Sequence, residues 1–284
     1  MATLKQIRQR IKTAKNIRQI TRAMKLVAAA RLRRATDRVL EARPYSEKMK
    51  AFMASLASAG ELPSHPLMEK REIRNVCLII ITSDRGLAGA YNSSLIRKAE
   101  DFVKSTAEPV QIIGVGKKGF QYFGKRKHNV VKSLSVASSG AALSDAIEVA
   151  NEARRLYESG AVDAVWVVYS KFYSAIRQVP QLVQLLPIEP PAGTEAGGTA
   201  FAFEPDAETL LDALLPRYFL TLVQQAMFEG TASEFGARMT AMTSATDNAG
   251  KMINELTLKA NRERQAAITK EILEVVGGAE ALKS

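Results

Sequence analysis

The stretch that decides the fold is residues 2–58, which begins ATLKQIRQRIKTAKNIRQITRAMKLVAA and contains one proline, Pro44, and no glycine. A second stretch, residues 206–276, contains one proline, Pro216, and three glycines. At a rise of about 1.5 Å per residue, continuous helices over these stretches would be roughly 85 and 100 Å long. Because most helices depend on packing against other elements for their stability, we expect the two stretches to pair with each other.

Both stretches carry apolar residues at every third or fourth position, which is the spacing of a narrow coiled-coil seam. In the first stretch these residues are Leu4, Ile7, Ile11, Ala14, Ile17, Ile20, Met24, Val27, Leu32, Ala35 and Val39. In the second stretch they are Met239, Met242, Ala245, Ala249, Ile253, Leu256, Ala260, Ile268, Ile272 and Val275. We expect the first helix either to fray at Pro44 or to bend there and continue to residues 59–60, and we expect a kink or break in the second helix at Pro216.

Between these stretches the apolar pattern changes to that of a compact α/β domain. Residues 76–82, VCLIIIT, predict a buried central strand. Strands and helices alternate from there, and Ser144 is a candidate N-cap. The other predicted strands are 110–115, 130–136, 164–169 and 181–186. The predicted helices are one that follows the turn at 83–92 and ends at about 104, and two more at 117–124 and 143–159.

The predicted fold class is α+β, with a long antiparallel two-helix coiled coil and an inserted Rossmann-like α/β domain. The N-terminal helix takes residues 1–59, the insert 73–188, a Pro- and Gly-rich linker 189–205, and the C-terminal helix 206–284. Asp206 is a candidate cap for that last helix. The two helices should be antiparallel because both are attached to one compact insert.

The net charge of +11 is concentrated at one end of the chain. Residues 1–50 hold 15 Lys and Arg against three acidic residues, so this segment alone carries +12. A positive electrostatic field along one helix favours a negatively charged partner, which could be nucleic acid, anionic lipid or an acidic protein surface.

The remaining composition excludes several classes of protein. The single cysteine, Cys77, excludes an internal disulfide and is typical of a reducing compartment. The longest apolar run, residues 76–81, is too short to cross a bilayer. The N-terminus has no hydrophobic signal core, and its Arg-rich pattern continues past residue 30, so we expect neither a signal peptide nor a transit peptide.

Two glycine-containing motifs follow predicted strands. Residues 114–119, GVGKKG, match G-x-G-x-x-G, which binds dinucleotides when an acidic residue follows about 20 positions later. The first acidic residue after the motif is Asp145, so tight packing of strand and helix explains these glycines more simply. Residues 83–89, SDRGLAG, end the first strand, and there Asp84 and Arg85 could bind a ligand or could hold the following turn and helix.

The sequence predicts no active site. It contains neither G-x-S-x-G nor H-E-x-x-H, its two histidines, His65 and His128, lie in loop-like settings, and no metal-ligand spacing occurs.

At four places the sequence resembles the γ-subunit family of F-type ATP synthases, and the spacing between them agrees along the whole chain. The first is the N-terminal segment with Ile7-Arg8, Ile11, Asn16 and residues 20–29. The second is ITSDRGL at 81–87. The third runs from Ser233-Glu234 to Asn248-Ala249. The fourth runs from Asn261-Arg262 to Gly278-Ala279.

This resemblance implies a central rotor shaft in the bacterial form of the complex. The helix pair would stand inside a hexamer of three α and three β subunits. Rotation of the c-ring, driven by proton flow, would then be coupled to ATP synthesis or hydrolysis. The ε subunit would bind alongside. The chain would be present in one copy, at the cytoplasmic face of the plasma membrane, and would not itself be catalytic. It would bind no cofactor, because ATP, ADP and Mg²⁺ belong to the α and β subunits.

The resemblance also assigns contact residues. Met24 and Lys25 would lie near an acidic lever segment of β. The residues that catch a loop of β would be Arg264, Gln265 and Thr269. An apolar bearing would hold Val275, Val276, Ala279 and Leu282. Phe203 and Glu204 would form a foot on the c-ring. The cysteine pair and inserted segment of the plastid form are absent, which excludes thiol switching.

Two alternatives remain open from the sequence. One is a nucleotide-dependent enzyme built on the α/β insert, which the missing acidic residue weakens. The other is a nucleic-acid binder that uses the basic helix. Its affinity would fall steeply with salt, but the basic stretch has no aromatic residue before Tyr45.

Overall fold

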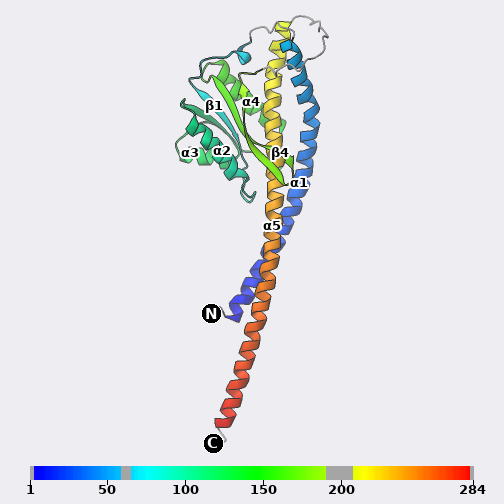
Figure 1. The fold of residues 1–284 in the computed structure, drawn as a ribbon, viewed down its shortest axis with the longest axis vertical. Helices are drawn as coiled ribbons and strands as arrows, with labels where there is room; N and C mark the ends of the chain where they lie inside the picture. The colour runs from blue at the N-terminus through cyan, green and yellow to red at the C-terminus, as the bar shows by residue number, and fades with distance from the viewer. Residues whose placement is uncertain (1–2, 59–64, 190–206, 282–284) are drawn as a thin grey trace. The chain divides into compact units, whose positions relative to one another are not determined.

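The computed structural model describes residues 3–58, 65–189 and 207–281 (Figure 1). The chain divides into two compact units. Unit 1 consists of residues 1–27 and 239–284, and unit 2 consists of residues 28–238. Two long helices, α1 (Leu4–Ser58) and α5 (Ala207–Ala281), contribute residues to both units. The predicted fold class, long N- and C-terminal helices around an inserted Rossmann-like domain, is confirmed.

In unit 1, the first part of α1 pairs with α5 in antiparallel orientation. The hydroxyl oxygens of Thr21 and Thr246 lie 2.8 Å apart. The Arg18 guanidinium lies against Gly250, where an added Cβ would be 3.8 Å from its Nε. Residue numbers therefore fall along one helix as they rise along the other, which is the antiparallel arrangement predicted from the sequence.

The contact seam of α1 differs in part from the predicted stripe. Ile7 and Ala14 are buried as expected, but Thr21 and Ala28 occupy the seam where Ile17, Ile20 and Val27 were predicted. The buried positions recur every seven residues, as in a coiled coil. Because Ala14, Thr21 and Ala28 are small, they allow α5 to approach closely. The more apolar side chains lie outside the seam: Ile20 is 59% exposed, and Ile17, Leu26 and Val27 are also exposed.

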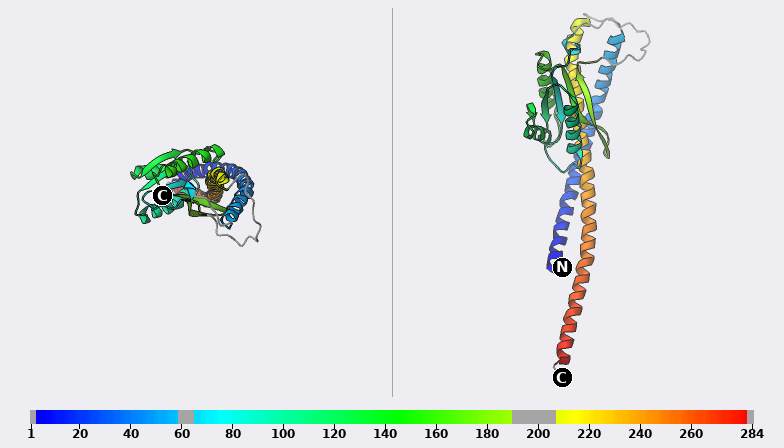
Figure 2. Two further views of the ribbon diagram at one scale, coloured as in Figure 1. Left: turned by 90° about the horizontal axis from the view of Figure 1, so that it is seen from above. Right: turned by 60° about the vertical axis from the view of Figure 1, so that its left-hand side comes forward.

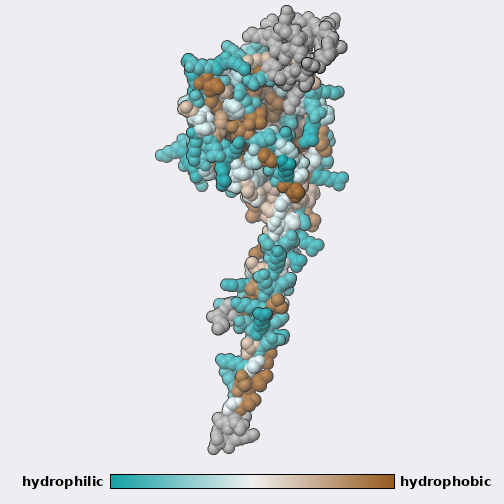
Figure 3. Space-filling model, in the orientation of Figure 1, coloured by the Kyte–Doolittle hydropathy of each residue, from teal (hydrophilic) through white to brown (hydrophobic). Residues whose placement is uncertain are grey.

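The C-terminal part of α5 is exposed on every side. Met242 and Ala249 are buried, and Ile253, Leu256 and Ala260 are half-buried, as the seam requires. From Arg264 to Gly278 every residue is exposed. These residues include Ile268, Ile272, Leu273, Val275 and Val276, and Figure 3 shows apolar side chains on the surface of this segment.

Unit 2 contains a five-stranded sheet in the order β3-β2-β1-β4-β5. The first four strands in this order are parallel, and β5 is antiparallel to β4. All six residues of β1 are buried, because the strand lies at the centre with helices over both faces. The strands are β1 (Val76–Ile81), β2 (Val110–Val115), β3 (Asn129–Leu134), β4 (Ala164–Ser174) and β5 (Arg177–Leu186).

Helices cover the sheet on both faces (Figure 2). Leu78 and Ile80 of β1 pack with α2 (Tyr91–Ser105) and α3 (Lys117–Lys125). Cys77, Ile79 and Ile81 pack on the other face with α4 (Leu143–Glu158) and with the α1 and α5 segments of unit 2. Those two segments are also antiparallel to each other, and Ser46 Oγ donates to Gln225 Oε1 at 2.7 Å. A 3₁₀ helix, η1 (Pro66–Met68), adds Leu67 to the same core.

Local predictions failed at two points and were narrowed at the two prolines. Ser144 is not the N-cap of α4, which is Ala142, whose amide donates to the Asp145 carboxylate at 2.9 Å. The last two strands are longer than predicted and form a hairpin through residues 174–177. Helix α5 does not break at Pro216, since burial of Leu215, Tyr218 and Phe219 around it offsets the roughly 3 kcal/mol that an interior proline costs. Helix α1 continues past Pro44 to Ser58, which is one of the two outcomes expected there. Asp206 and most of the predicted linker lie outside the described residues.

Cys77 is expected to resist alkylation in the native protein. Burial in the core raises the pKa of its thiol to about 12, and nearby Glu152 adds to this, so the thiolate is scarce at pH 8. Incubation with iodoacetamide at pH 8, followed by mass spectrometry, should show an unmodified chain in buffer and full labelling in denaturant. Labelling in buffer at the denatured rate would contradict this burial.

No helix within the described ranges combines the length and the apolar content that crossing a membrane requires.

Candidate functional site

The point of the sheet at which a ligand would be expected is the carboxyl end of β1. After β1 the chain forms β2 on one side of that strand, and β4 later pairs with the other side of β1. Open α/β sheets bind ligands in the crevice at such a switch point. Residues 82–90, which include the SDRGLAG motif, form the loop at this end of β1.

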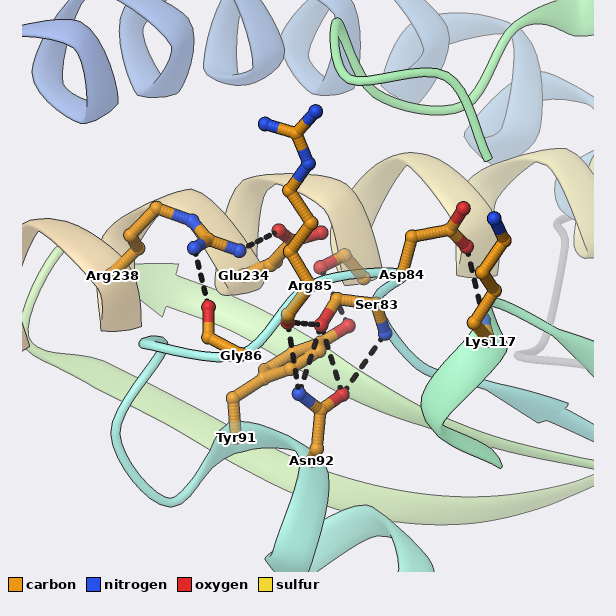
Figure 4. Close-up of polar contacts among 10 residues, drawn as sticks. Ser83, Asp84, Arg85, Gly86, Tyr91, Asn92, Lys117, Glu234 and Arg238 are labelled. Atoms are coloured by element: carbon orange, nitrogen blue, oxygen red, sulfur yellow. Dashed lines mark hydrogen bonds and ion pairs between the residues drawn. The ribbon is translucent and has the colours of Figure 1, made fainter. Parts of the chain in front are cut away.

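The loop is held by its own polar side chains (Figure 4). The Ser83 amide donates to Asn92 Oδ1 at 3.0 Å, and the Ser83 hydroxyl lies 2.7 Å from the Arg85 carbonyl oxygen. Asn92 belongs to the first turn of α2, so these contacts tie the loop to that helix. Leu87 adopts a φ of 65°, which is rare for a branched side chain.

Asp84 caps α3 rather than the helix that follows it in sequence. Its carboxylate accepts from the Lys117 amide at 2.9 Å and from the Val136 amide at 3.3 Å. A helix N-terminus is an anion site because its first N–H groups lack partners within the helix. Here the chain's own carboxylate occupies that position. Asp84 is therefore structural.

The G-x-G-x-x-G motif also serves packing. A Cβ on Gly116, whose φ is 85°, would lie 2.2 Å from the Thr82 carbonyl oxygen, and one on Gly119 would lie 2.9 Å from Thr82 Oγ1. The Gly119 amide donates to that hydroxyl at 2.8 Å. The amides of Lys117 and Gly119 already donate hydrogen bonds to Asp84 and Thr82. A dinucleotide phosphate at this place would find no free amide donor there and would be repelled by the Asp84 carboxylate.

Helix α5 fills the crevice itself. The Tyr91 hydroxyl donates to the Gly230 carbonyl at 2.9 Å, and the Ser233 hydroxyl donates to the Ser170 carbonyl of β4 at 2.8 Å. The Phe172 amide of β4 donates to Glu229 at 3.4 Å. A Cβ on Gly230 would lie 3.0 Å from Ile81 Cγ2, so glycine allows the helix to approach the end of β1.

One turn further along α5, a charged pair completes the contact. Arg238 Nη2 lies 2.5 Å from the Glu234 carboxylate, and Nη1 donates to the Gly86 carbonyl at 2.6 Å. The side chains of Arg238 and Glu234 are 11% and 18% exposed. Burial raises the pKa of Glu234, and Arg238 opposes that rise. We call Glu229, Gly230, Ser233, Glu234 and Arg238 the α5 clamp.

The α5 clamp joins the α/β insert to the long helix at the position that a ligand would otherwise occupy. Within the described residues no group of three or more His, Cys, Asp and Glu side chains could hold a metal ion. The arrangement can transmit force between the insert and α5.

The structure separates the residues predicted as partner contacts into two groups, both in unit 1. Met24 and Lys25 are half-buried neighbours on α1. Arg264, Gln265 and Thr269 are exposed on α5, where the Thr269 hydroxyl donates to the Gln265 carbonyl at 3.0 Å. Val275 and Val276 are 72% and 58% exposed. Phe203, Glu204, Leu282 and the side chain of Ala279 lie outside the described residues.

The α5 clamp was not among the sites predicted from the sequence. Ser233 and Glu234 marked only a family resemblance, and Gly230 was only one of the three glycines of the second long stretch. A glycine inside an otherwise helical pattern is a signal of close approach. The partner of that approach, the loop after β1, lies about 140 residues away in sequence.

Comparisons with known proteins agree on one family. Residues 3–282 match the profile of the family described as ATP synthase. The chain is 45% identical over 283 residues to the ATP synthase gamma chain of Desulfitobacterium hafniense, covering all of both chains. It is 46% identical over 290 residues to that of Anaeromyxobacter sp. strain Fw109-5, again over the full length of both.

Solved structures are similar over most of the fold. A chain of the Tetrahymena thermophila mitochondrial ATP synthase, in a structure of the central stalk and c-ring, has a TM-score of 0.62 at 25% identity. That match covers 80% of this chain and 99% of the other. A chain of the Euglena gracilis mitochondrial ATP synthase has a TM-score of 0.72 at 21% identity, over 98% and 94% of the two chains, and shows the same fold. The chain described here belongs to the ATP synthase γ chain family.

Proposed function

We propose that this chain is the central rotor shaft of a proton-driven ATP synthase. The observation that carries this proposal is the similarity to bacterial ATP synthase γ chains at 45–46% identity over the full length. The shaft couples rotation of a c-ring to ATP synthesis or hydrolysis at sites on three α and three β subunits. Its own role is mechanical and not catalytic.

Unit 1 has surfaces suited to such a shaft. The residues in the seam between its two helices are buried, whereas Ile17, Ile20 and Val27 of α1 are exposed outside the seam. The same part of α1 also carries a row of lysines and arginines. The surface of the helix pair therefore carries exposed apolar and basic side chains and is not uniform around its axis. A partner with several conformations is shifted toward the one that a given side contacts best. Rotation of an asymmetric shaft thus favours a different β conformation at each angle.

The contacts expected on this shaft are those that the family resemblance implies. Met24 and Lys25 meet an acidic lever segment of β, and the exposed row of Arg264, Gln265 and Thr269 catches a loop of β. The apolar end of α5 with Val275 and Val276, continued by Ala279 and Leu282, turns in a bearing at the top of the hexamer. Phe203 and Glu204 form the foot on the c-ring.

The α5 clamp gives the insert a mechanical role. In the proposed assembly, torque enters near the membrane, where the c-ring and the ε subunit bind. Hydrogen bonds from Tyr91, Arg238 and Ser233 join the insert directly to α5. The helix then carries the torque to its C-terminal end.

The proposal includes the copy number of the chain and its place in the cell. One copy would serve each complex at the cytoplasmic face of the bacterial membrane, peripheral and attached only through its partners. ATP, ADP and Mg²⁺ would bind the α and β subunits, and no nucleic acid would be involved. The filled crevice at the end of β1 argues against the alternative of a nucleotide-dependent enzyme at that site.

Co-expression with α and β subunits tests the proposal. The chain should co-purify with both, and the steady ATPase activity of the complex should depend on its presence, with α and β alone as the control. Failure to co-purify would reject the proposal.

A further inference from the structure

A groove of about 620 Å³ lies between α2 and α3, within unit 2. The two helices cover the face of the sheet opposite α4. Its volume lies within the usual range for small-molecule sites. Figure 3 shows a mostly hydrophilic surface over these two helices.

Four cationic side chains line the groove. They are Arg97 on α2 and Lys118, Lys125 and Arg126 on or directly after α3. In the described part of the chain no carboxylate forms an ion pair with any of them.

The single carboxylate in the groove, Glu100, is already engaged. Lys104 Nζ lies 3.1 Å from it, and the Tyr122 hydroxyl donates to it at 2.9 Å. These two hydrogen bonds lower the pKa of Glu100. Glu100 also interacts with Arg126 through their charges, but a single carboxylate that is already paired with Lys104 leaves the groove with an excess of positive charge.

The groove also offers a surface for stacking. The Arg126 guanidinium carbon lies 3.6 Å from the centroid of the Tyr122 ring, which is a cation–π contact. The hydrogen bond from Tyr122 to Glu100 fixes the far end of that ring. Ile96 adds an apolar side chain to the lining.

We propose that this groove binds a small polyphosphate anion, supplied either as a nucleoside triphosphate or as inorganic tripolyphosphate. Arginine and lysine are the side chains that recognise phosphate, and arginine does so with two parallel hydrogen bonds. A nucleotide would also place its base beside the guanidinium and ring. An acidic protein segment fits less well, because stable protein interfaces need a larger surface than one groove. The proposal goes beyond the rotor function and does not depend on it.

Isothermal titration of the full chain, without Mg²⁺, tests the proposal with tripolyphosphate, ATP, adenosine and poly-glutamate. Tripolyphosphate and ATP should bind, and adenosine should not. Tighter binding of ATP would identify the nucleotide as the source, and equal binding would identify the inorganic anion. No binding of either at millimolar concentration would overturn the proposal, as would binding of poly-glutamate alone.

Matched variants locate the site. Lys118→Gln with Lys125→Gln should weaken binding of tripolyphosphate at least about tenfold. Lys98→Gln with Lys12→Gln removes the same charge from exposed positions outside the groove and should weaken it less than about threefold. Equal weakening would overturn the proposal. Arg126→Lys keeps the charge and should weaken ATP more than tripolyphosphate if the base stacks there. Thermal melts of each variant should match that of the parent chain.

Discussion

Replacing Arg238 by methionine is expected to destabilise unit 2 by about 3–5 kcal/mol, because it leaves the buried Glu234 carboxylate without its partner. The same change removes the donor to the Gly86 carbonyl, so the loop after β1 loses a contact with α5. Urea unfolding followed by circular dichroism measures the loss. Arg155→Met breaks an exposed pair with Glu152 and should cost no more than about 1 kcal/mol.

The loss should depend on pH in a defined direction. Burial raises the pKa of Glu234 above its unfolded value. The stability that the protonated group contributes is therefore present below the unfolded pKa and is lost as the pH rises through the folded pKa. Removing Arg238 raises that pKa further. The variant should thus lose more stability at pH 8 than at pH 5, and adding Glu234→Gln should recover part of the loss at pH 8. A loss that is equal at both pH values would contradict this account of the clamp.

Removing residues from Leu273 onward is expected to leave the complex assembled while proton-coupled ATP synthesis falls. The described residues beyond Arg264 are exposed on every side, so their removal takes no packing from the chain itself. In the proposed bearing, each valine that becomes buried would contribute about 1.5–3 kcal/mol. Purification of the complex measures assembly, and ATP synthesis in reconstituted vesicles measures coupling.

Two further variants separate the apolar bearing from mere helix length. Val275→Ser with Val276→Ser keeps the length and should reproduce most of the fall in ATP synthesis. Lys270→Gln with Glu274→Gln removes an exposed ion pair and should leave synthesis unchanged. Full synthesis by the truncated chain would show that this end of α5 is dispensable.

Much of the fold could be predicted because its signals are local. Six consecutive apolar residues, 76–81, predicted β1, and the change from strand-like to helix-like spacing of apolar residues on either side of the insert predicted the two long helices. The seam of α1 was harder, because the helix carries two stripes of suitable spacing. Apolar content favoured Ile17 and Ile20 for the seam, whereas close packing of the two helices selected Thr21 and Ala28.

The candidate site could not be predicted in the same way. The α5 clamp depends on contacts such as Tyr91 with Gly230 and Gly86 with Arg238, which join residues about 140 to 150 positions apart. No period or spacing within either segment indicates the other. Asp84 shows the same limit: its neighbours in sequence suggested a cap for α2, and the fold placed the start of α3 beside it instead.

The central claim, that this chain turns inside its partners, is tested most directly by observing rotation. Ser105 at the end of α2 is exposed, and Cys77 is buried, so Ser105→Cys gives a single accessible thiol for a probe. With the complex immobilised through its β subunits, the probe should turn in one direction while ATP is present and stop when ATP is removed. Continued ATP hydrolysis with a stationary probe would contradict the account.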